Sequence, residues 1–65
     1  MPKYSELKRE FIKAACFLVE EGKEHEKWFS PITGKYFRMS RHNNQEVPYG
    51  TEAVLRKQAG VPKKR

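Results

Sequence analysis

Two histidines are the side chains of this sequence best suited to move a proton, because imidazole alone has an ordinary pKa close to neutral pH. His25 lies three residues after Gly22 and opens a segment whose residues alternate like a strand. His42 follows Arg41, just past the next strand-like segment. For His42 the choice stays open between an ordinary loop histidine and a second proton carrier or nucleic-acid contact.

Basic and aromatic residues accompany His25 on one face of the two strand-like segments. Side chains alternate between the faces of a strand, so one face is expected to carry His25, Lys27, Phe29, Tyr36 and Arg38. Arginine and lysine there would hold phosphates, as would Arg41 just beyond the second segment. The two aromatic rings would stack on unpaired bases or form the apolar centre of a protein interface.

The elements that position these residues follow from periodicity and turn signals. We expect a helix over residues 5–15 with Ser5 as N-cap, strands over 16–20, 25–30 and 35–40, and a helix over 51–59 with Thr51 as N-cap and Gly60 after its end. Leu7 and Phe11 share one helical face and would cover the apolar sheet face. That sheet face would carry Phe17, Val19, Trp28, Phe37 and Met39. The order predicts an α+β domain, α-β-β-β-α, with a three-stranded antiparallel sheet and both helices on one face.

Size and composition narrow the function classes. The chain of 65 residues allows one domain, expected over 1–62, with a basic tail at 63–65. The net charge of +6 favours a polyanionic partner, nucleic acid first. A single cysteine, no long apolar run and no signal peptide predict a cytoplasmic protein without a membrane segment.

Four acids crowd between Glu20 and Glu26, and we interpret them as solvated charge rather than as a metal site. Two of them, Glu24 and Glu26, flank His25, and nearby negative charge favours imidazolium. Cys16, His25 and His42 lack any recognised zinc spacing, so no metal or cofactor is expected.

Several blocks of the chain resemble, in order and spacing, the HicA family of bacterial and archaeal toxins. The blocks are residues 3–7 (KYSEL), 21–28 (EGKEHEKW), 30–35 (SPITGK), 41–42 (RH), 50–51 (GT) and 56–60 (RKQAG). The resemblance covers residues 3–61. It differs at Glu24, where the family usually has a small polar residue, at Ala15, where the family often has glycine, and at Ser40, where proline is usual.

The resemblance implies a fold like a double-stranded-RNA-binding domain and the activity of a toxin in a type II toxin–antitoxin system. Such proteins cleave messenger RNA without a metal ion, and they pair with a HicB-type antitoxin. The family's active histidine, near the start of the second strand, corresponds to His25. The sequence leaves open whether His25 would take a proton from a ribose 2′-hydroxyl or donate one to the leaving 5′-oxygen. Two alternatives remain, a non-catalytic RNA-binding module and a protein-interaction domain.

Overall fold

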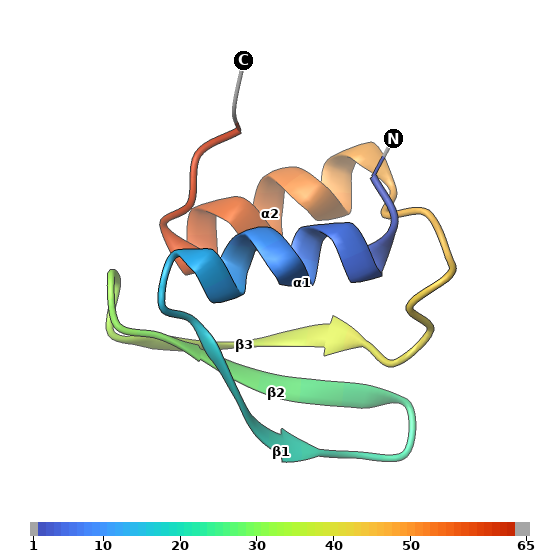
Figure 1. Cartoon of the computed structure of the whole chain (residues 1–65), viewed down its shortest axis with the longest axis horizontal. Coiled ribbons are helices and arrows are strands. Elements are labelled where there is room, and N and C mark those ends of the chain that lie inside the picture. Colours follow the sequence, from blue (N-terminus) through green and yellow to red (C-terminus); the bar gives the residue numbers. More distant parts are fainter. Residues whose placement is uncertain (1, 64–65) are drawn as a thin grey trace.

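The computed structural model describes residues 2–63 and contains the five elements in the predicted order (Figure 1). They are α1 (Tyr4–Lys13), β1 (Phe17–Glu21), β2 (His25–Ser30), β3 (Lys35–Ser40) and α2 (Tyr49–Ala59). Of the predicted basic tail, residues 64 and 65 lie outside the described residues. No helix within residues 2–63 is both long and apolar enough to cross a bilayer.

The three strands form one antiparallel sheet in the order β1-β2-β3, joined by short turns. Both helices lie on the same side of this sheet, which leaves its other face without a covering layer (Figure 1). The predicted α+β architecture is therefore confirmed. The uncovered side is called the open face below.

The core lies between the helices and the covered face of the sheet. Leu7 and Phe11, one helical turn apart, are completely buried, as predicted. The other buried apolar residues are Tyr4, Cys16, Trp28, Phe37, Met39, Val47, Leu55 and Ala59. Phe11 contacts Phe37 edge to face, and Trp28 stacks on Phe37, so aromatic contacts join α1 to β3 and β3 to β2.

The predicted helix starts are wrong at both helices, whereas the predicted glycine end is confirmed. Helix α1 begins at Tyr4, and the amide groups of Tyr4 and Ser5 donate to backbone carbonyls of Gln45 and Asn43. A side-chain cap from Ser5 is therefore not needed, because a distant loop satisfies the first turn. Helix α2 starts at Tyr49, and Gly60 ends it with a positive φ of 73°.

The predicted phase of β1 is also wrong. Phe17 and Val19 were expected in the core, but their side chains are 51% and 46% exposed. Cys16, three residues after the end of α1, is buried, so alternation points Phe17 outward and Leu18 toward the covered face. The register then shifts between Leu18 and Glu20, a bulge in which Val19 is the extra residue.

Candidate functional site

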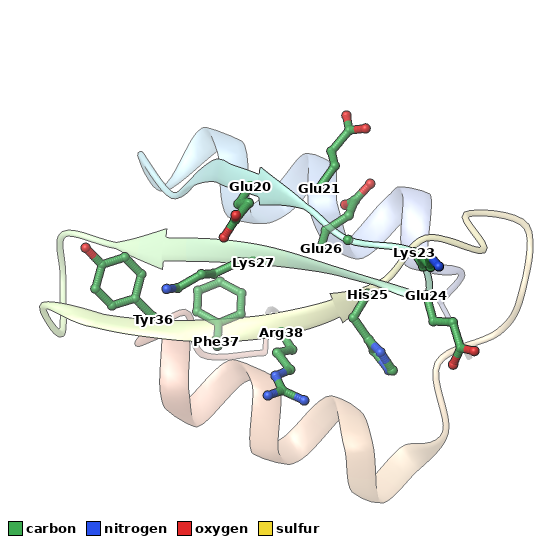
Figure 2. Close-up of a pocket in the computed structure, with 11 residues that line it drawn as sticks. Glu20, Glu21, Lys23, Glu24, His25, Glu26, Lys27, Tyr36, Phe37 and Arg38 are labelled. Atoms are coloured by element: carbon green, nitrogen blue, oxygen red, sulfur yellow. The ribbon is translucent and has the colours of Figure 1, made fainter.

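The open face carries three rows of side chains that run across the strands. Strand pairing places Phe17 opposite Phe29 and Phe29 opposite Tyr36, which forms the aromatic row. The charged row consists of Glu20, Lys27 and Arg38, and the last row pairs His25 with Ser40. Five of the predicted site residues therefore lie together: His25, Lys27, Phe29, Tyr36 and Arg38. A shallow depression here is lined by residues 20–27 and 36–38 (Figure 2).

The backbone of His25 is held by the turn that joins β1 to β2. The Gly22 amide donates to the His25 carbonyl oxygen at 2.8 Å. A Cβ atom on residue 22 would lie 2.7 Å from that same oxygen, so the close approach requires glycine. The imidazole itself is exposed on the open face. A fixed backbone with an accessible ring is the arrangement that a proton-transfer residue needs.

Two cations neighbour His25 along the open face. Arg38 lies opposite Lys27 and one row from the His25–Ser40 pair. In Figure 2 the side chains of His25 and Arg38 extend in the same direction, beyond β3. The Lys27 ammonium instead reaches along the sheet toward Tyr36 and lies 4.6 Å from the centre of its ring (Figure 2). Phosphate near His25 would therefore meet Arg38 without rearrangement of the strands.

Arg41 has a different environment from the other predicted phosphate ligands. Its guanidinium donates to the Lys23 carbonyl oxygen at 2.7 Å, and its amide donates to the Glu24 carbonyl oxygen at 3.4 Å. It lies just past the end of β3, and its positive charge helps to lower the pKa of Glu26. In this structure Arg41 thus fastens the turn that precedes His25. Contact between Arg41 and RNA stays a prediction.

His42 is exposed beyond the end of β3, and its amide donates to the Ser40 hydroxyl at 3.1 Å. It is not among the residues that line the depression. The structure thus brings His25 to Lys27, Arg38 and the aromatic row, and leaves His42 outside that group.

A polar cluster beneath the site corrects the interpretation of Glu26 as solvated charge. Glu26 points to the covered side, where the Lys8 ammonium lies 2.7 Å from its carboxylate and also donates to Asn43 at 2.5 Å. The Trp28 indole donates to the same carboxylate at 3.1 Å. Burial alone would raise the pKa of Glu26, but these two hydrogen bonds and the charges of Lys8 and Arg41 together lower it.

A second buried ionic cluster, which sequence reasoning missed, removes one cation from the surface. Arg56 of α2 is 8% exposed and donates to Glu52 on its own helix and to Glu10 on α1. These two carboxylates raise the pKa of Arg56, against the effect of burial. The i, i+4 spacing of Glu52 and Arg56 was visible in the sequence, whereas the 46-residue separation from Glu10 gave no signal.

Residues 2–63 contain no group of three or more His, Cys, Asp or Glu side chains arranged to hold a metal ion. Comparison with protein-family models, curated proteins and solved structures found no match to this chain.

Proposed function

We propose that this chain is an endoribonuclease of the HicA type, which cleaves messenger RNA without a metal ion and uses His25 for proton transfer. The observation that carries the proposal is the position of His25, exposed on the uncovered side of the sheet and accompanied there by Lys27 and Arg38. In the covered layer the imidazole could not reach a ribose. On the open face it is exposed to solvent, one row from Lys27 and Arg38, whose positive charges suit a phosphate.

The proposed chemistry needs one proton carrier and a held phosphate. Neutral imidazole of His25 takes the proton from the 2′-hydroxyl, whose oxygen then attacks the adjacent phosphorus, or imidazolium donates a proton to the leaving 5′-oxygen. Arg38 offers a planar fork to two phosphate oxygens, and Lys27 offers a point charge. Positioned proton transfer contributes typically ~10²–10⁴-fold to a rate, which suffices for a slow nuclease.

The proposal extends to a fold of the double-stranded-RNA-binding type, a cytoplasmic location and a HicB-type antitoxin as partner. The sequence blocks support all three. An exposed apolar row beside the proposed catalytic residue supports the partner in addition, since an inhibitor that covers it would also cover His25.

A non-catalytic RNA-binding module is the second candidate. The grouping of two cations with exposed rings on the open face favours it, since this grouping is enough to bind RNA without any proton transfer. Lys27, Arg38 and the aromatic row would serve binding equally well in such a module.

The experiment that decides is incubation of the purified protein with messenger RNA in the presence and absence of a chelator. We expect cleavage in both, and we expect His25→Ala to lower the rate by about 100-fold or more. His42→Ala is the matched control and should cleave within a few-fold of the parent. RNA that stays intact with the parent protein, or cleavage that survives in His25→Ala, would refute the proposed enzyme.

A further inference from the structure

Three aromatic rings touch in sequence across the open face, one from each strand. The Phe17 and Phe29 rings have centroids 5.6 Å apart, and the Phe29 and Tyr36 rings have centroids 4.9 Å apart. Phe17 completes this row only because β1 has the phase described above. The row therefore spans the full width of the sheet rather than two strands.

These rings are accessible, in contrast to the aromatic rings of the core. The side chains of Phe17 and Tyr36 are 51% and 57% exposed, and Phe29 between them is partly exposed. The rings of Phe11, Trp28 and Phe37 are buried between the helices and the sheet. Apolar surface in contact with water is unfavourable, so three adjacent exposed rings on one face indicate a contact surface.

Charge on the neighbouring row indicates which class of molecule the surface fits. Lys27 and Arg38 flank the rings and outnumber Glu20, the one acid in that row. The Lys27 ammonium already lies against Tyr36, within reach of any anion that approaches the ring. Rings bordered by cations match an unpaired nucleic-acid strand, whose bases present flat faces and whose phosphates are negative.

The position of the rings relative to His25 sets what they would bind. Phe29 and His25 lie on the same strand, four residues apart, which is about 13 Å along β2. The charged row lies between them. A base stacked on the rings therefore belongs to a nucleotide that neighbours the one whose phosphate lies at His25, and not to that nucleotide itself.

We infer that Phe17, Phe29 and Tyr36 form a base-stacking platform that holds unpaired nucleotides beside the proposed cleavage site. This inference rests on the proposed function in that it makes the ligand RNA. It goes further by requiring that the RNA be single-stranded where it meets the rings, because the faces of paired bases are hidden within the duplex.

The platform is tested by binding, separately from cleavage, with the His25→Ala protein. The probe is a fluorescein-labelled, unstructured RNA of about 10 nucleotides, a length typical of small single-strand-binding folds. Its affinity is compared with that of the same strand annealed to its complement. We expect tighter binding of the single strand, and we expect Phe17→Ala, Phe29→Ala and Tyr36→Ala each to weaken that binding by roughly tenfold.

Matched variants separate stacking from general apolar contact. Tyr36→Phe keeps the ring and should keep the affinity, whereas Tyr36→Leu keeps an apolar side chain without a π face and should lose it. Tyr49→Ala removes an exposed aromatic ring from α2, away from the open face, and should have no effect. Circular dichroism of each variant confirms that it is folded.

Two patterns of outcome distinguish this inference from the proposed enzyme. If the parent protein cleaves RNA but the ring variants bind like the His25→Ala protein, the platform is wrong and the enzyme stands. If the ring variants lose binding but the parent never cleaves, the platform stands and the enzyme falls. Equal affinity for single strand and duplex, retained affinity in Tyr36→Leu, or undetectable RNA binding would each overturn the platform.

Discussion

At the scale of single residues, Ala15 determines how the chain enters the sheet. Its φ is 76°, the left-handed region that side chains with a Cβ resist. The amide groups that follow α1 still find partners, since Ala15 donates to Ile12 and Cys16 donates to Phe11. Gly60 ends α2 with almost the same φ, but without that cost.

Ala15→Gly should therefore stabilise the protein. A non-glycine residue in the left-handed region costs about 1–2 kcal/mol, and part of that gain is offset by the greater freedom of glycine in the unfolded chain. We expect the free energy of unfolding, measured by urea denaturation, to rise by about 1 kcal/mol. Ala14→Gly is the control: Ala14 has a negative φ, so the same exchange should give no stabilisation. Equal effects at both positions would contradict the argument.

At the scale of elements, β2 joins the two layers of the molecule. Its open face carries His25 and Lys27, while its covered face binds α1 through Glu26 and receives α2 at Ser30, whose hydroxyl donates to the Ala59 carbonyl at 2.5 Å. The strand that presents the candidate catalytic residue is thus anchored by both helices. This anchoring makes the position of His25 sensitive to the polar cluster beneath it.

Glu26→Gln should weaken the protein and flatten its response to acid. The pKa of Glu26 is lower in the folded than in the unfolded protein. Its contribution is therefore fully present above the unfolded value of about 4.3, and is lost as pH falls through the folded value. We expect the variant to lose about 2 kcal/mol at neutral pH, because Lys8 is left largely buried without its counter-ion.

The measurement is urea denaturation from neutral pH down through the acid range, on the parent and on two variants. Glu46→Gln is the control, since the side chain of Glu46 is exposed. The parent and the control should lose stability in acid, while Glu26→Gln should lose less. If the free energy of unfolding fell equally with pH in all three proteins, the Lys8–Glu26 pair would not contribute to the stability of the fold.

The order of elements and the faces of β2 and β3 were predictable because they depend on local periodicity. Two-residue alternation correctly separated Trp28, Phe37 and Met39 from His25 and Arg38. Such alternation persists as long as no residue is inserted, and neither of these strands contains a bulge. The site residues on β2 and β3 were predictable for the same reason.

Features that depend on one unusual dihedral or on distant partners were not predictable. The phase of β1 depends on the left-handed Ala15 and on the bulge at Val19, neither of which has a sequence signature of its own. The buried role of Glu26 depends on Lys8, which belongs to another element. Simple alternation therefore predicts Phe17 in the core and gives the aromatic row two rings instead of three.

At the scale of the whole molecule, the net charge of +6 does not show which cations act on the surrounding solvent. Lys8 and Arg56 are each 8% exposed and are paired with carboxylates, so they contribute little to the field outside. Lys27 and Arg38 are exposed on the open face. The proposed RNA contacts should therefore depend on these two residues rather than on the overall charge.

Salt dependence of RNA binding tests this distribution of charge. For single strands, the slope of log affinity against log salt falls by about 0.7 for each phosphate contact. We expect Lys27→Ala and Arg38→Ala each to reduce the slope by about that amount. Lys13→Ala removes an exposed cation at the end of α1 and should leave the slope unchanged. An equal loss in all three variants would show that the RNA responds to total charge alone.

The bulge at Val19 affects whether molecules of this protein pair through their edge strands at high concentration. Strand β1 is the margin of the sheet, and its first three residues, Phe17, Leu18 and Val19, are all apolar and exposed. A flat strand of this kind would template fibre growth by adding neighbours through its unused amide and carbonyl groups. The extra residue bends that rim, and Glu20 and Glu21 follow it directly with two negative charges. The irregularity in β1 thereby discourages aggregation.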